Sequence, residues 1–374
     1  MLALKNSASS LFMQKYASLP PFIFRKPELK QVSALLEKDG DFAVVGVPGI
    51  GRRTLIHQAA SQANVRYMAI DCLRCRSASQ FVQLFFDSIM TAFKEPGEKA
   101  VIDQWSHLQS VPLVLSRDRT RFLLSVASGK EWALFEQLLA LPQHLAEALA
   151  CRVAIAFHNF SHLRAWDRQQ KWEVRLLQEI QQQDRVSYAI VAIVSEPWMA
   201  QMGLPVIFLG PLSDRDIQRW IVHKMDKANL SFDADSQSLE LFLSYIQGHI
   251  KDAIALAQRI QLVCHASSLP SPVKVIHADC VRSSMLALVK DIEVTFEALL
   301  LLLPPTQAKL LESLSLDPTD RPQSLTYIKK HHLSRGGGLQ GALSSLEQKG
   351  LIYGPHLEYR VALPLFDFWL KQRL

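Results

Sequence analysis

The apolar positions in the first 210 residues alternate between short unbroken runs and longer stretches with helical spacing. Unbroken apolar runs are typical of strands buried on both faces. Five such runs are Phe42–Val45, Val65–Asp71, Arg152–Phe157, Ser187–Ser195 and Val206–Leu209. Between them, apolar residues recur every three or four positions, as in Phe81, Leu84, Phe85 and Ile89, which predicts helices. Residues 95–130 permit no firm assignment. The alternation predicts a doubly wound, mostly parallel α/β sheet.

The pattern changes after Pro211, where strand-like runs stop. Three helical segments follow and predict a helical lid: Asp214–Lys227, Ser236–Ile246 and Lys251–Cys264. Near the C-terminus, Leu339, Leu343 and Leu346 share one helix face, and two short runs, Leu351–Tyr353 and Tyr359–Ala362, predict a hairpin. This order is typical of a winged helix-turn-helix. We therefore predict an α/β domain over residues 1–210, a lid over 211–268 and a winged helix over 269–374.

Composition narrows the class of protein only slightly. The net charge of +6 and the 49% hydrophobic content fit a globular protein with a weak preference for anionic partners. Five cysteines do not indicate a disulfide scaffold, so a reducing cytoplasm is expected. The longest apolar run, Ala298–Leu303, is far shorter than the roughly 20 residues of a membrane span. Cys72-x-x-Cys75 and His277-x-x-Cys280 have metal-ligand spacing, but nothing brings the pairs together, and we predict no metal site.

The first apolar run leads into a glycine-punctuated loop, Gly46-Val-Pro-Gly49-Ile-Gly51, and then into a helix. Such a loop wraps phosphate with backbone N–H groups at a helix N-terminus. The usual pattern is G-x-x-x-x-G-K-S/T, in which the lysine reaches the phosphates and the hydroxyl holds Mg²⁺. Here Arg52 stands at the lysine position and Arg53 at the hydroxyl position, while Thr54 comes one residue late. A structural alternative is a tight strand-to-helix turn that glycine permits.

Several stretches, in order along the chain, resemble the archaeal-type ATPase branch of the AAA+/STAND nucleoside triphosphatases. They are Phe22-x-x-Arg25-x-x-Glu28-Leu29, Ala69-Ile-Asp71-Cys72, Leu209-Gly-Pro-Leu212 and Phe366-x-x-Trp369-Leu370. The resemblance implies a P-loop fold, ATP or ADP as ligand, and sensor residues at Ser195 and Lys251. It also implies an Asp-Glu pair after the third strand, where this chain has His158 and Asn159.

Where the chain differs from this family's motifs, it lacks the side chains that would bind Mg²⁺ and activate water for hydrolysis. In working members, an Asp orients the Mg²⁺ shell and a Glu polarises water, and His158 and Asn159 carry no negative charge for either task. Arg52 can contact phosphate but does not replace lysine. We therefore expect weak or absent binding of ATP or ADP, no firmly held Mg²⁺ and no hydrolysis.

Two other readings stay open at this stage. The winged helix predicts DNA contact through Lys329, Lys330, Arg335, Gln340 and Ser344, although no arginine lies on the recognition helix to read guanine; packing against protein is the alternative. A slow ATPase would use Thr54 for the metal and a carboxylate such as Glu196. The favoured hypothesis is a non-catalytic scaffold or switch that acts through a protein partner or through homo-oligomers, in the cytoplasm and without a membrane.

Overall fold

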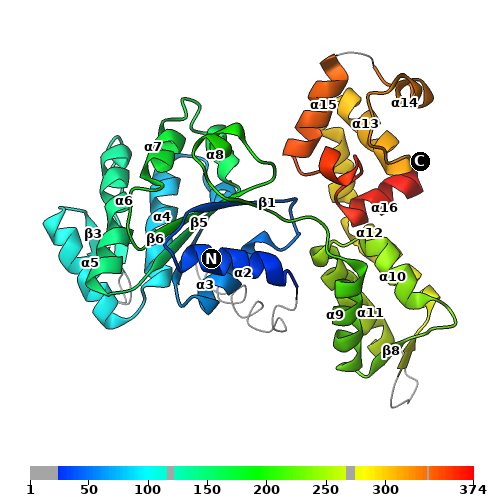
Figure 1. Ribbon diagram of the computed structural model, residues 1–374, viewed down its shortest axis with the longest axis horizontal. Coiled ribbons are helices and arrows are strands. Elements are labelled where there is room, and N and C mark those ends of the chain that lie inside the picture. The colour runs from blue at the N-terminus through cyan, green and yellow to red at the C-terminus, as the bar shows by residue number, and fades with distance from the viewer. Residues whose placement is uncertain (1–23, 116–121, 267–273, 335–336) are drawn as a thin grey trace.

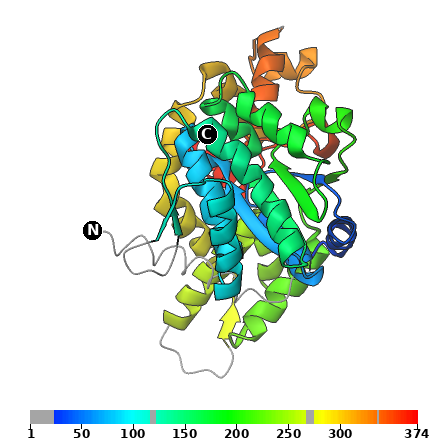
Figure 2. The same ribbon diagram turned by 90° about the vertical axis from the view of Figure 1, so that its left-hand side faces the viewer.

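The computed structural model describes residues 24–115, 122–266, 274–334 and 337–374. Three parts follow one another along the chain: an α/β unit, a helical lid and a C-terminal winged helix. In both views the winged helix lies at the upper end of the molecule and the lid at the lower end (Figures 1 and 2). The predicted boundaries between the parts, after residues 210 and 268, stay predictions.

The α/β unit contains a five-stranded parallel sheet in the order β2-β5-β6-β1-β7. The strands are β1 (Phe42–Val45), β2 (Arg66–Asp71), β5 (Val153–His158), β6 (Val186–Ala192) and β7 (Val206–Phe208). In the register, Val44 pairs with Val191 and Ile70 pairs with Phe157. Residues of β1, β5 and β6 are buried throughout, as their unbroken apolar runs predict. The predicted fold class, a doubly wound parallel sheet followed by a helical region and a winged helix, is confirmed.

Helices cover both faces of this sheet. Because side chains alternate along a strand, Ala43 and Val45 face one apolar cluster and Phe42 and Val44 face the other. The first cluster includes side chains of four helices: α4 (Ala78–Ala92), α5 (Pro96–Leu108), α6 (Glu131–Ala148) and α7 (Lys171–Glu179). The second includes α2 (Lys26–Leu36) and α3 (Arg52–Gln62). The sheet is therefore the middle layer of three.

Residues 95–130, which the sequence left unassigned, hold α5 and an antiparallel pair of strands. Pro96-Gly97 looks like a helix breaker, yet proline at the first helical position is favourable, and Glu95 and Glu98 form a capping box there. After α5, β3 (Leu113–Leu115) pairs with β4 (Phe122–Leu124). These strands are too short for a clear period-two pattern.

The lid and the winged helix share one apolar core. The lid contains α9 (Asp214–Asp226), α10 (Ser238–Ile246) and α11 (Ile250–Ala266). The expectation that strands end at Pro211 is wrong, because β8 (Leu230–Phe232) pairs with β9 (Lys274–Ile276) in parallel. The long helix α12 (Ala278–Leu301) contacts α10 and α11 of the lid and also α16 of the winged helix. A single cluster therefore runs from Ile217 to Trp369.

The winged helix consists of α13 (Pro305–Leu316), α14 (Leu325–Lys330), α15 (Gly337–Gln348), α16 (Pro364–Arg373) and a short wing. Leu339, Leu343 and Leu346 are buried on α15, as predicted. The wing is less regular than the predicted hairpin: Ile352 and Val361 form an isolated antiparallel bridge. Among the described helices, none has the length and apolar character needed to cross a membrane.

Candidate functional site

The glycine loop connects the end of β1 to the start of α3, at the edge of the sheet where the parallel strands end. Gly49 and Gly51 have φ angles of +87° and +100°, a region that favours glycine. A side chain on Gly46 would lie 2.6 Å from the carbonyl oxygen of Leu209. The glycines therefore let the backbone turn sharply and approach β7. The backbone course is that of a strand–loop–helix phosphate cradle.

Arg52, at the position of the usual lysine, is directed toward the end of β6. Its side chain is buried, and its Nη1 donates a hydrogen bond of 2.7 Å to the carbonyl oxygen of Ala192. Burial lowers the pKa of Arg52 to about 10, and the neighbouring Arg53 contributes further. The guanidinium is therefore engaged by the protein's own backbone.

Arg53 belongs to a polar network that joins three elements of the α/β unit. Its Nη2 lies 3.0 Å from Oδ2 of Asp71, at the end of β2. Asn159, directly after β5, donates from Nδ2 to the other oxygen of Asp71 over 2.9 Å. Asp71 also caps the short 3₁₀ helix Cys72–Arg74 by accepting from the amide of Leu73. The carboxylate of Asp71 is thus neutralised by Arg53.

His158 occupies the last position of β5 and is buried, with 4% of its surface exposed. The Tyr67 hydroxyl lies 3.0 Å from its Nε2. Burial, followed by the nearby positive charge of Arg53, lowers the pKa of His158 to about 3. The imidazole is therefore neutral at physiological pH, and neither His158 nor Asn159 provides negative charge where the resemblance places a catalytic Asp-Glu pair.

The two predicted sensor residues lie in different environments. Ser195 follows β6 in a loop, because β6 ends at Ala192 and not at Ser195 as expected, and its hydroxyl is 4.0 Å from the sulfur of Met199. Lys251 has an exposed side chain, but its backbone N–H donates to the carbonyl oxygen of Gly49 over 3.2 Å. Lys251 thus reaches the loop by its main chain. Thr54 is half-buried in the first turn of α3.

The lid closes over the glycine loop through His249, which the sequence analysis did not single out. The side chain of His249 is 2% exposed, and its Nε2 donates to the carbonyl oxygen of Pro48 over 2.9 Å. A side chain on Gly49 would lie 2.6 Å from this ring. The imidazole therefore packs directly against the loop that would surround a phosphate.

The winged helix reaches the same loop. Gly350, just after α15, packs so closely on Pro48 that an added Cβ would lie 2.6 Å from the proline ring. Asp252 links the lid to α16: its Oδ2 is 3.2 Å from Nδ1 of His249 and accepts from the amide of Leu365 over 3.3 Å. Contacts therefore run continuously from the loop through the lid to the winged helix.

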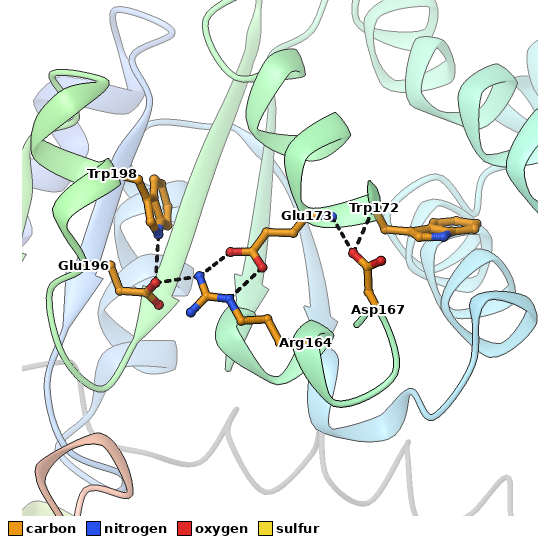
Figure 3. Close-up of polar contacts among 6 residues, drawn as sticks. All are labelled: Arg164, Asp167, Trp172, Glu173, Glu196 and Trp198. Carbon is orange, nitrogen blue, oxygen red and sulfur yellow. Dashed lines mark hydrogen bonds and ion pairs between the residues drawn. The ribbon is translucent and has the colours of Figure 1, made fainter. Parts of the chain in front are cut away.

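A second polar cluster, shown in Figure 3, lies beyond the ends of β5 and β6. Arg164 binds both carboxylate oxygens of Glu173 and donates over 2.6 Å to Glu196. Trp198 donates to the same oxygen of Glu196 over 3.0 Å. Glu196, the carboxylate considered for a slow ATPase, is therefore occupied by an arginine and an indole.

The residues predicted to contact DNA are mostly on the surface of the winged helix. Lys329, Lys330, Gln340 and Ser344 are exposed, while Arg335 lies outside the described residues. Lys330 pairs with Asp317 at 2.7 Å, and Gln340 is hydrogen-bonded to Gln323. Two of the four described candidates are thus already engaged by neighbouring side chains.

A magnesium–nucleotide complex does not fit this arrangement of side chains. Mg²⁺ needs oxygen ligands in near-octahedral geometry, yet Asp71 is held by Arg53 and Asn159. Among the described residues, no group of three His, Cys, Asp or Glu side chains gathers as a metal site. The His249 ring packs against Gly49 of the loop. In the described part of the chain, the groups that could still bind an anion here are the backbone N–H groups of the loop at the start of α3.

Comparison with known proteins identifies the fold. Residues 294–372 match a family described as a probable winged helix domain. The whole chain is similar to the structure of a Walker-type ATPase of Pyrococcus abyssi, with a TM-score of 0.65, 13% identity and coverage of 93% of this chain and 95% of that one. Two further structures resemble this chain, each with a TM-score of 0.50. One is the Aeropyrum pernix ORC2 protein in its ADP form, at 11% identity and 95% coverage of both chains. The other is Drosophila ORC bound to DNA, at 14% identity and coverage of 96% of this chain and 88% of that one.

A search among curated proteins finds no match. The similar solved structures and the winged helix match show that the chain has the fold of AAA+ ATPases with a C-terminal winged helix. At such low identities the likeness concerns the fold, and it does not transfer an activity.

Proposed function

We propose that this protein is a non-hydrolysing relative of the archaeal-type AAA+/STAND ATPases, with degenerate Walker motifs. It acts as a scaffold or switch through a protein partner or through copies of itself. One observation carries the proposal: neutral His158 and Asn159 stand where a metal-holding and a water-activating carboxylate are needed. Without those carboxylates, neither Mg²⁺ nor an attacking water is oriented.

The contacts of the lid with the glycine loop support a role that depends on how the α/β unit, the lid and the winged helix contact one another, and not on ATP hydrolysis. His249 binds Pro48, and Asp252 connects His249 to the amide of Leu365 in the winged helix. An anion entering the loop must displace the imidazole, and this displacement loosens the link to the winged helix. Binding at the loop is thereby coupled to the position of the winged helix by reciprocal linkage.

The test is calorimetric titration of the full chain with ATP and ADP, each with and without Mg²⁺. The expected dissociation constant is weaker than about 100 μM and indifferent to Mg²⁺. Turnover of Mg·ATP is measured beside Arg52→Ala and Thr54→Ala variants, and equal background rates are expected. Metal-dependent hydrolysis that disappears in either variant contradicts the proposal and favours the slow ATPase.

DNA binding by the winged helix is the second candidate. It is favoured by the exposed Lys329, Gln340 and Ser344 on and before α15, and the similar Drosophila ORC is bound to DNA in its structure. Fluorescence anisotropy with a labelled duplex at low and moderate salt tests it. Affinity that falls steeply with salt and weakens in Lys329→Ala supports DNA contact. No binding at low salt rules it out.

A further inference from the structure

Two cysteines lie side by side where the end of lid helix α11 meets the start of α12. The sulfur of Cys264, in the last turn of α11, is 3.5 Å from the sulfur of Cys280, in the first turn of α12. We propose that Cys264 and Cys280 form an oxidisable dithiol, a modification site that hydroperoxides convert into a disulfide.

The two helix ends give the thiols different reactivities. Cys280 occupies the third position of a 24-residue helix, where the positive end of the helix dipole stabilises a thiolate. A hydrogen bond from Cys264 is the largest influence and lowers the pKa of Cys280 to about 7. Cys264 lies at the negative end of α11, and the shared hydrogen bond to Cys280 raises its pKa. Cys280 is thus the attacking thiolate and Cys264 the resolving thiol.

The other cysteines provide an internal comparison. Cys72 and Cys75 are buried in the segment between β2 and α4, and burial raises the pKa of both thiols, that of Cys75 to about 11. Burial also raises the pKa of Cys151. Since the thiolate is the reactive form, these three thiols are expected to react slowly at neutral pH.

The chemistry balances with hydrogen peroxide as the oxidant. The Cys280 thiolate attacks one peroxide oxygen, forming a sulfenic acid and releasing hydroxide. The Cys264 thiol then attacks the sulfenic sulfur, the S–S bond forms, and water leaves with the thiol proton. In total, two thiols lose two hydrogens and one peroxide becomes two waters. A dithiol reductant reverses the change by exchange.

The disulfide would join the lid to the helix that continues into the winged helix. Cys264 lies in the last turn of α11, whereas α12 contacts α10 and α11 of the lid and α16 of the winged helix. The new bond closes the chain between residues 264 and 280 and restricts the unfolded state. We expect oxidation to raise the melting temperature of the full chain by a few degrees.

Peptide mapping of the full chain tests the proposal. The reduced protein is treated with about one equivalent of hydrogen peroxide, blocked with iodoacetamide, digested without reductant and analysed by mass spectrometry. The expected product is a peptide pair joined through Cys264 and Cys280, with Cys72, Cys75 and Cys151 alkylated. Without peroxide, iodoacetamide should label Cys280 roughly tenfold faster than Cys151 at neutral pH.

Variants separate the two roles. Cys264→Ser should stop at a Cys280 sulfenic acid that dimedone captures, whereas Cys151→Ser, the matched control, should still form the linked pair. Peroxide treatment that leaves Cys264 and Cys280 unlinked in the folded wild-type chain overturns the proposal, and this measurement needs no variant. Linkage that forms equally well in urea also overturns it, because the folded geometry would then contribute nothing.

Discussion

Nε2 of His249 lies 2.9 Å from the carbonyl oxygen of Pro48, so that a lid side chain occupies the mouth of the glycine loop. If this contact competes with an anion, His249→Ala should bind ADP more tightly than the wild type. A net hydrogen bond of about 1 kcal/mol corresponds to roughly a fivefold change in dissociation constant. Titration calorimetry measures it, with His265→Ala as the control, because His265 is exposed in the last turn of α11, the helix that begins directly after His249. Unchanged or weaker ADP binding would mean that the imidazole does not compete.

His158 should make the stability of the protein sensitive to acid. Its pKa is about 3 in the folded state and about 6.5 when exposed, so the unfolded chain binds more protons between these values. Stability is therefore expected to fall as the pH drops through 6.5 toward 3, by about 2 kcal/mol between pH 7 and pH 5. His158→Gln should reduce this loss in urea unfolding curves.

The matched control for that measurement is His107→Gln, because the side chain of His107 is 77% exposed. This variant should keep the pH dependence of the wild type. An identical slope for His158→Gln and the wild type would show that the buried imidazole does not carry the acid sensitivity.

Introducing a carboxylate after β5 should lower the folding stability of the protein and should not produce ATP hydrolysis. Asn159→Glu replaces an amide that donates to Asp71 over 2.9 Å with a like charge, which disfavours ionisation of both carboxyls. We expect a loss of about 1–2 kcal/mol at neutral pH. The loss should shrink as the pH falls, because a raised carboxyl pKa makes the folded state take up protons first. Denaturation at two pH values checks this, with Asn159→Gln as the uncharged control. Magnesium-dependent ATP turnover by Asn159→Glu would contradict the prediction.

Arg164 should stabilise the edge of the sheet beyond β5 and β6 more than an ordinary surface arginine. It neutralises Glu173, whose side chain is only 3% exposed, and Arg164→Ala leaves that charge buried and unpaired. Such a loss costs about 3 kcal/mol. Arg164→Lys should recover only part of it, because an ammonium does not match both carboxylate oxygens in a planar fork.

Urea unfolding of these variants is compared with Arg168→Ala, an exposed neighbour that is expected to change stability by less than about 0.5 kcal/mol. The double variant Arg164→Ala/Glu173→Gln should be more stable than Arg164→Ala alone, since the buried charge is then gone. A double variant that is less stable would indicate that packing of the arginine stem, and not its charge, is the main contribution.

Much of the fold follows from local patterns. The apolar runs of β1, β5 and β6 are long enough to be read as buried strands, and Leu339, Leu343 and Leu346 mark the buried face of α15. The strand pairs β3–β4 and β8–β9 were missed because each strand has three residues, too few for a periodic signal. β7 is equally short, but its apolar run extends to Leu209 and follows the alternation of strands and helices. Helix α5 was missed because the proline that begins it is also a common breaker.

The candidate site was only partly predictable. The glycine spacing located the loop, and Arg52, Arg53, His158 and Asn159 could be named from the sequence as the residues around it. Their partners could not, because Arg53 meets Asp71 and Arg52 meets Ala192 only when the strands assemble. His249 carried no signal in the sequence, since a histidine in the short turn between two helices is ordinary until its neighbour across the fold is known.

The sequence by itself determined the layered α/β sheet, the order of the parts and the absence of a carboxylate at positions 158 and 159, because burial periodicity and residue type are local properties. Only the tertiary structure decided that the loop is covered, since Pro48 and His249 are 201 residues apart. It likewise brought the sulfurs of Cys264 and Cys280 together. Contacts between residues so far apart in the sequence depend on how helices and strands pack in three dimensions. A local pattern of apolar and polar residues does not show which distant segments will pack together.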